Sequence, residues 1–179
     1  CIIAGGTESM SLVPTAGWKT VPSYSIAKDD PDYYLSMGLT AEAVARDFNI
    51  SREAQDEFSY NSHQKAIAAI QNGHFKPGIL PINVEEVYLD AKGKKQKRNY
   101  LMDTDEGPRA DTSKEALAKL KPAFAQGGVV TAGNSSQTSD GAAFVIVMGE
   151  KMMNELGLKP IGRLVDSGVA GVHRRIMGI

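Results

Sequence analysis

The chain has 179 residues, of which 42% are hydrophobic and 23% charged, and its formal net charge is −1. This length predicts one domain, or one domain and part of another, and the balanced charge gives no electrostatic reason to expect nucleic acid or a membrane surface as a partner. No apolar run approaches the ~20 residues of a membrane-spanning helix, and the single cysteine cannot form an internal disulfide.

The first residues predict the end of a buried strand. Cys1 opens an apolar run that Gly5 and Gly6 close, so we expect Cys1 to be a packed core residue rather than a nucleophile. Residues 10–36 show no periodicity and contain several prolines, which predicts a long irregular stretch. Because the chain also stops inside an apolar segment, at 175–179, we expect it to be an internal part of a longer chain, with any targeting signal outside it.

Two helices are expected next. The apolar face of the first consists of Ala41, Val44, Ala45 and Phe48. Thr40 is placed to cap the start of this helix with its hydroxyl. The second helix is expected to run from Ser51 to Gln71, with Gly73 just past its end.

The rest of the chain alternates strand and helix signals. Residues 79–89 are rich in β-branched side chains, and 92–95 are typical of a hairpin turn. Residues 112–115 form a capping box for a short helix through Leu120, which Pro122 ends. Three further elements are expected: a strand at 143–148, a helix at 150–156 and a strand at 162–166.

A hydroxyl-rich segment lies between two apolar runs. From Gly133 to Gly141 the chain reads G-N-S-S-Q-T-S-D-G. The glycines allow close approach to the backbone, and the hydroxyls suit a neutral, extended ligand that takes several modest hydrogen bonds. A polyphosphate does not fit, because no Lys-Ser/Thr pair follows a glycine loop. The residues alone leave an ordinary loop open as the alternative.

Charged and metal-binding candidates give weaker signals. Arg109 lies in a loop before the capped helix, where it is either a surface charge or a clamp for a phosphate or a purine. The basic run at 92–98 is a solvated hairpin tip or a contact for an anion. The three histidines show no metal-ligand spacing, and we expect no metal site.

Five ordered motifs resemble the thiolase family, the acetyl-CoA C-acyltransferases. They are IIAGGTESMS at 2–11, MGLTAE at 37–42, DEGPR at 105–109 with LAKLKPAF at 117–124, VTAGNSS at 130–136 with DGAA at 140–143, and GV with IMG at 171–178. The resemblance runs from one end of the chain to the other.

The resemblance implies an α/β fold that is part of the thiolase fold, with core strands and helices of two similar halves and an inserted α+β loop domain. It assigns 1–8 to the end of an N-terminal core strand and 9–125 to the inserted loop domain, which covers coenzyme A and substrate. It assigns 126–157 to the return to the N-terminal core and 158–179 to the start of the C-terminal half.

The implied activity is thiolytic cleavage of 3-ketoacyl-CoA to acyl-CoA and acetyl-CoA in fatty-acid β-oxidation, through a cysteine acyl-enzyme. In the family the nucleophilic cysteine precedes the segment that matches 2–6, and the base histidine and acid cysteine follow the region that matches this chain. We therefore expect no catalytic residue here and no activity from this chain alone. The alternatives are a non-catalytic CoA-ester-binding module, a biosynthetic acetoacetyl-CoA thiolase and a structural subunit of a lipid-oxidation complex.

The resemblance also implies ligands and partners. Coenzyme A is a co-substrate, and no permanently bound cofactor is expected. The implied contacts are Arg109 at the adenine nucleotide, Ser136 and Ala132 at the pantetheine arm, and Met37, Leu120 and Phe124 around the acyl and pantetheine tunnel. The full-length protein is expected to be a homodimer or a dimer of dimers with a possible β-oxidation partner subunit, in the bacterial cytoplasm or in the mitochondrial or peroxisomal matrix.

Two positions depart from the family pattern. Ser36 stands where acetoacetyl-specific members often carry histidine, which favours longer acyl chains. His173 and Arg174 replace the usual Asp-Pro, and we expect the turn there to differ.

Overall fold

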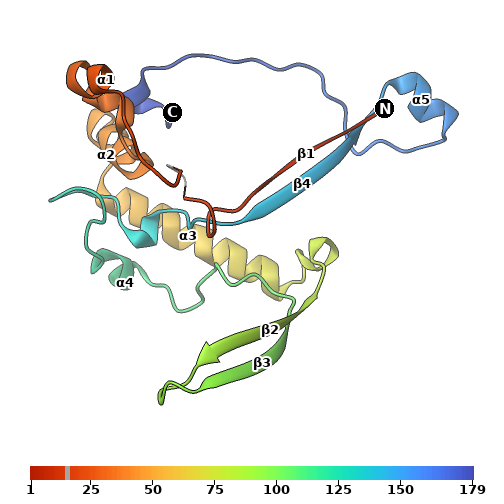
Figure 1. The fold of residues 1–179 in the computed structure, drawn as a ribbon, viewed down its shortest axis with the longest axis horizontal. Helices are drawn as coiled ribbons and strands as arrows, with labels where there is room; N and C mark the ends of the chain where they lie inside the picture. The colour runs from red at the N-terminus through yellow and green to blue at the C-terminus, as the bar shows by residue number, and fades with distance from the viewer. Residues whose placement is uncertain (15–16) are drawn as a thin grey trace. The chain divides into compact units, whose positions relative to one another are not determined.

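The computed structural model describes residues 1–14 and 17–179, which form two compact units (Figure 1). One unit combines Cys1–Phe48 with Ser136–Ile179, and the other is Asn49–Ser135. Helices and strands occur in both units, as expected for an α/β chain. In order, the α-helices and strands are β1 (Ile2–Glu8), α1 (Tyr24–Asp29), α2 (Met37–Asp47), α3 (Arg52–Gln71), β2 (Ile82–Leu89), β3 (Lys95–Met102), α4 (Lys114–Ala118), β4 (Gly141–Val147) and α5 (Glu150–Glu155).

Strands β1 and β4 form an antiparallel ribbon in the first unit, with Ile2 opposite Val147 and Glu8 opposite Gly141. Gly5 is needed in this ribbon, because a Cβ there would clash with the ring of Phe144 on β4. Both strands are exposed along their whole length, since no other helix or strand in the described part of the chain covers them. The expectation that Cys1 is a packed core residue is therefore wrong for this structure, in which Cys1 is exposed.

The stretch expected to be irregular, 10–36, contains α1 and a 3₁₀ helix, Pro31–Tyr34. Positions 15 and 16 of this stretch lie outside the described residues. Helix α2 also begins earlier than expected, because its N-cap is Ser36, whose Oγ accepts from the backbone N of Leu39 at 3.5 Å. Thr40, expected as the cap, is instead buried, and its hydroxyl donates to the carbonyl of Ser36 at 3.2 Å.

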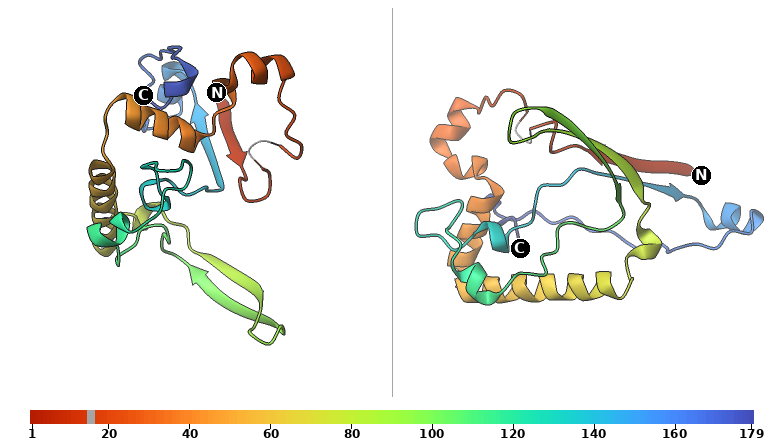
Figure 2. Two further views of the ribbon diagram at one scale, coloured as in Figure 1. Left: turned by 90° about the vertical axis from the view of Figure 1, so that its left-hand side faces the viewer. Right: turned by 90° about the horizontal axis from the view of Figure 1, so that it is seen from below.

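The second unit confirms the expected long helix and hairpin. Ser51 caps α3 by accepting from the backbone N of Ala54 at 3.2 Å, and Gly73 follows the helix with φ of 72°. Strands β2 and β3 pair antiparallel, and Asp90 Oδ1 organises the turn between them by accepting from two backbone N–H groups, each at 2.9 Å. Figure 2 shows α4 beside the first part of α3.

Three further expectations need correction. The N-cap of α4 is Ser113 rather than Thr112, and its Oγ accepts from the backbone N of Ala116 at 3.1 Å. The strand expected at 79–89 begins at Ile82. No strand forms at 162–166, where Leu164 is 85% exposed and no neighbouring strand in the described residues offers a hydrogen-bonded partner.

His173 and Arg174, where the chain departs from the family pattern, begin a short 3₁₀ helix, Arg174–Ile176, with His173 as its N-cap. Arg174 forms an ion pair with Asp30, and its Nε donates to Asp30 Oδ1 at 2.8 Å. Arg175 lies within ion-pair distance of Asp32 and Asp47. These contacts attach the segment to the α1–α2 region of the same unit, and whether the turn differs from that of relatives stays a prediction.

Candidate functional site

The first part of the hydroxyl-rich segment is a tight turn built from its own side chains. A 3₁₀ turn, Ala132–Asn134, has Thr131 as its N-cap, and Thr131 Oγ1 accepts from the backbone N of Gly133 at 3.2 Å. Asn134 Oδ1 accepts from the backbone N of Thr131 at 2.7 Å, which completes a capping box. Ser135 Oγ donates to the carbonyl of Thr131 at 2.7 Å. These polar side chains therefore fix the shape of the turn.

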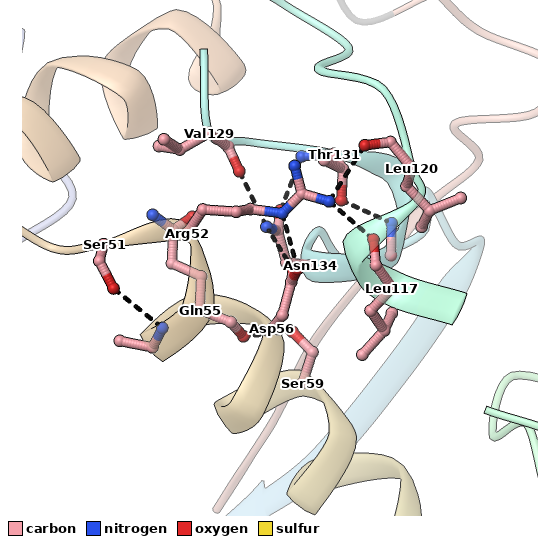
Figure 3. Close-up of polar contacts among 12 residues, drawn as sticks. Ser51, Arg52, Gln55, Asp56, Ser59, Leu117, Leu120, Val129, Thr131 and Asn134 are labelled. Atoms are coloured by element: carbon pink, nitrogen blue, oxygen red, sulfur yellow. Dashed lines mark hydrogen bonds and ion pairs between the residues drawn. The ribbon is translucent and has the colours of Figure 1, made fainter. Parts of the chain in front are cut away.

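Helix α3 supports the turn from beneath through a buried carboxylate (Figure 3). Asn134 Nδ2 donates to Asp56 Oδ1 at 3.2 Å and to the carbonyl of Val129 at 3.0 Å. Asp56 Oδ2 accepts from Arg52 Nε at 2.7 Å, and the Asp56 side chain is only 7% exposed. A carboxylate this deeply buried requires such partners, because an unpaired buried charge is costly.

Arg52 connects this carboxylate to α4. Its Nη2 donates to the carbonyl of Leu117 at 2.7 Å and to the carbonyl of Leu120 at 3.0 Å. Carbonyls at the C-terminal end of a helix lack partners within the helix, and a cation is favourable there. One guanidinium therefore joins α3, the end of α4 and, through Asp56, the turn at 131–134.

Gly133 allows the turn to pack closely on α4. A Cβ at this position would lie 2.7 Å from Leu117 Cδ2 and would also clash with Leu120 Cδ1. Of the candidate ligand contacts, the structure therefore places Leu120 against the turn that contains Ala132. Phe124 belongs to the same unit, and its side chain is partly exposed.

The later hydroxyls of the segment are exposed. Ser136 begins the stretch assigned to the other unit, and its Oγ donates to the carbonyl of Gln137 at 3.2 Å. Thr138 and Ser139 are also exposed. The segment therefore has two parts, one that builds the turn and one that leaves hydroxyls available to a ligand.

Arg109 lies at the surface beside an acidic residue. Its Nε and Nη2 contact the two carboxylate oxygens of Asp111, each at 3.3 Å, and its side chain is 68% exposed. The hydrogen bonds and charge of Asp111 raise the pKa of Arg109, and the same contacts lower the pKa of Asp111. The backbone N of Arg109 donates to His63 Nδ1 on α3 at 3.1 Å, which anchors this loop.

The remaining candidates lie in the first unit. Met37 is 60% exposed at the start of α2, and Ser36 caps that helix. Sequence reasoning missed Arg52, Asp56 and Asn134 as site residues. The spacing of Arg52 and Asp56 did not predict that they are buried, because an i,i+4 Arg–Asp pair is typical of a solvated helix face.

Two kinds of feature do not occur among the described residues. No group of three or more histidine, cysteine, aspartate or glutamate side chains there is arranged to hold a metal ion. No helix there combines the length and apolar character needed to cross a bilayer.

The chain is similar to several known proteins over nearly its whole length. The family described as Thiolase, N-terminal domain, matches residues 1–151. The chain is 45% identical to the 3-ketoacyl-CoA thiolase of Bacillus subtilis, over 99% of this chain and 45% of that protein. It is 44% identical to the acetyl-CoA acetyltransferase of Pseudomonas aeruginosa, over 99% of this chain and 46% of that protein. The chain thus spans about half the length of the curated relatives it matches.

Solved structures agree with these relatives. The dimeric peroxisomal thiolase of Saccharomyces cerevisiae has a TM-score of 0.79 and 38% identity, over 98% of this chain and 43% of that one. Human mitochondrial 3-ketoacyl-CoA thiolase has a TM-score of 0.75 and 36% identity, over 98% of this chain and 45% of that one.

Proposed function

Because the chain belongs to the thiolase family and its fold is part of the thiolase fold, we propose that it forms the coenzyme A and acyl-binding part of a 3-ketoacyl-CoA thiolase. Membership and fold confirm the prediction made from the five motifs. The observation that carries the proposal is the 45% identity to a 3-ketoacyl-CoA thiolase over 99% of the chain. The reaction is thiolytic cleavage of a 3-ketoacyl-CoA, as in β-oxidation.

The arrangement of the second unit supports a role in holding the pantetheine arm. This arm is neutral, extended and rich in amides, so that it needs a preorganised surface with modest hydrogen-bonding groups. The turn at 131–134 is fixed by its own side chains and by Asp56, with Leu120 against it. Ser136, which follows this turn in the chain, carries an exposed hydroxyl.

The nucleotide end of coenzyme A is assigned to Arg109. A guanidinium accommodates both a phosphate, through paired N–H donors, and a purine, through stacking on its face. Its partner Asp111 is exposed, and an exposed pair of this kind contributes little. Breaking the contact with Asp111 therefore requires little free energy when the Arg109 guanidinium binds a ligand.

In the full-length enzyme these residues bind and orient, while the covalent step belongs to residues outside this chain. A cysteine thiolate, activated by a histidine base, attacks the 3-keto carbon. The bond between C2 and C3 of the substrate then breaks, acetyl-CoA leaves as its enolate and takes a proton from the acid cysteine, and the acyl group stays on the nucleophile as a thioester. The thiol of a second coenzyme A then takes the acyl group. Residues of this chain contribute by holding first the 3-ketoacyl-CoA and then coenzyme A in register with that cysteine.

A second candidate is the biosynthetic acetyl-CoA acetyltransferase, favoured by the relative of that name at 44% identity. Ser36 argues for the degradative activity, because a small side chain there leaves room for a longer acyl group. Other features are part of the same proposal: coenzyme A as co-substrate without a resident cofactor, and a homodimeric full-length protein, by analogy with the dimeric yeast thiolase. The proposed location is the cytoplasm for a bacterial source and the mitochondrial or peroxisomal matrix for a eukaryotic one.

The test uses the full-length enzyme and a series of 3-ketoacyl-CoA substrates of increasing chain length. Loss of the 3-ketoacyl absorbance on addition of coenzyme A measures thiolysis. We expect kcat/KM to be larger for medium chains than for acetoacetyl-CoA. A sharp optimum at acetoacetyl-CoA would support the biosynthetic candidate, and binding of coenzyme A without turnover of any substrate would favour a non-catalytic module.

A further inference from the structure

The Asp56 carboxylate touches both the turn and the guanidinium of Arg52. One oxygen accepts from Asn134 Nδ2 at 3.2 Å and the other accepts from Arg52 Nε at 2.7 Å (Figure 3). Both contacts lie in the second unit, and the Arg52 and Asp56 side chains are 18% and 7% exposed. Solvent therefore does little to replace either contact if it is lost.

The hydrogen-bonding capacity of the partners requires a carboxylate at this position. Arg52 and the Asn134 amide nitrogen both donate, so the group between them must accept on both sides. An asparagine at position 56 would offer one oxygen and one NH₂. In either orientation of that amide, one donor would face another donor.

Asp56 and Arg52 together contact both parts of the proposed pantetheine site, the turn at 131–134 and the segment that carries Leu120. Through Asn134, Asp56 holds the turn that contains Ala132. Through the carbonyls of Leu117 and Leu120, Arg52 holds the chain segment that carries the Leu120 side chain. Movement of one side relative to the other would therefore require these hydrogen bonds to break.

We propose that Asp56 and Arg52 are positioning residues for coenzyme A, which fix the turn at 131–134 and Leu120 in the geometry that receives the pantetheine arm. This inference rests on the proposed function. Neither side chain touches the ligand, and their effect passes through Asn134 and the backbone of the turn. A preorganised turn lowers the entropy lost when the ligand binds.

The test compares Asp56→Asn with Glu57→Gln in the full-length enzyme. Glu57 is a matched control, because its Oε1 accepts from Lys114 Nζ at 2.7 Å and so also joins α3 to α4, but both of these side chains are more than half exposed. The constants are measured well below the melting temperature of each variant. We expect Asp56→Asn to raise KM for coenzyme A about tenfold, while kcat changes less than about threefold. Glu57→Gln should leave both constants unchanged.

Hydrogen exchange tests the turn independently of activity. The backbone N–H groups of Thr131 and Gly133 bond within the turn, and we expect Asp56→Asn to reduce their protection while Glu57→Gln does not. If protection is unchanged, or if it falls while KM stays the same, the inference is overturned. If instead the unmodified enzyme shows no thiolysis, the proposed function fails, and the exchange result still decides whether Asp56 orders the turn.

A double variant that moves the carboxylate from position 56 to position 134 separates loss of the hydrogen bond from general misfolding. Asn134→Asp alone places two carboxylates against each other, whereas the double variant Asp56→Asn/Asn134→Asp restores an amide-to-carboxylate hydrogen bond between these positions. In the double variant the oxygen of the new amide also accepts from Arg52. We expect the double variant to recover part of the exchange protection and of the affinity lost by Asn134→Asp. A double variant no better than Asn134→Asp would overturn the inference.

Discussion

Arg109 and Asp111 form an exposed pair whose partners have different expected roles in ligand binding. Arg109→Ala should weaken coenzyme A binding to the full-length enzyme by about 1–3 kcal/mol, because a charge-assisted contact to the nucleotide is lost. Asp111→Asn frees the guanidinium from its 3.3 Å contacts and should not weaken binding. Isothermal titration with coenzyme A, and with a pantetheine analogue that lacks the nucleotide, checks both. Equal loss of affinity for the two ligands in Arg109→Ala would contradict the assignment.

Ser36 has two separable roles, a helix cap and a proposed wall of the acyl site. Ser36→Ala removes the oxygen that accepts from Leu39 N, and the free energy of unfolding should fall by about 0.5–2 kcal/mol with an unchanged preference for chain length. Ser36→His should shift kcat/KM toward acetoacetyl-CoA, because the larger ring fills the space used by longer chains. Urea unfolding and the substrate series measure the two effects. A change of preference in Ser36→Ala would mean that the cap itself controls specificity.

At the same residue scale, the sequence marked the hydroxyl-rich segment but not the residues that support its turn. The density of hydroxyls at 135–139 marked the segment as unusual, and the structure leaves Ser136 exposed. The contact assignments for Ser136, Ala132 and Arg109 stay predictions. Asn134 and Asp56 could not be paired from sequence, because they are far apart in the chain and only the folded packing of α3 on the turn brings them together.

Helix α4 and the turn at 131–134 depend on the missing side chain of Gly133. Gly133→Ala should lower the free energy of unfolding by about 1–3 kcal/mol, because the new methyl would collide with Leu117 and Leu120 in a buried contact. Gly141→Ala is the control, since a Cβ there meets no atom within 4 Å. Urea unfolding followed by far-UV circular dichroism compares the two variants. Equal free energies of unfolding in the two variants would show that the turn can move away from α4 without loss of stability.

At the element scale, local signals predicted those elements whose stability is local. Ser51 at the start and Gly73 at the end of α3, and the turn residues 92–95, were enough to predict α3 and the β2–β3 hairpin. The strand expected at 162–166 does not form, because a strand requires a partner that periodicity cannot supply. Helix α1 was not predicted, because it is short and lies between prolines, where the helix propensity of the sequence is weak. The four-part division into core and inserted domain stays a prediction.

For the molecule as a whole, the ribbon β1–β4 leaves large apolar side chains exposed. Ile3 and Ile146 are cross-strand partners and are 72% and 65% exposed. We expect the 179-residue chain in isolation to self-associate, because apolar faces and unpaired strand edges favour contacts between copies. Sedimentation velocity should show a concentration-dependent mass that falls in the double variant Ile3→Lys/Ile146→Lys. A monomer at all concentrations would contradict this expectation.

The isolated chain should bind coenzyme A weakly and catalyse nothing. Arg109 and Ser136 are present, but we expect other residues of the full-length enzyme to complete the tunnel. We therefore expect a dissociation constant above ~0.1 mM, equivalent to about −5.5 kcal/mol. We expect the family's nucleophile, base and acid to lie outside this chain, whose single thiol is the exposed Cys1. Incubation of the purified chain with acetoacetyl-CoA and coenzyme A, followed by the 3-ketoacyl absorbance, measures turnover. Turnover above background that persists in Cys1→Ser would mean that another residue of this chain carries the chemistry, and the division of labour proposed for the full-length enzyme would be wrong.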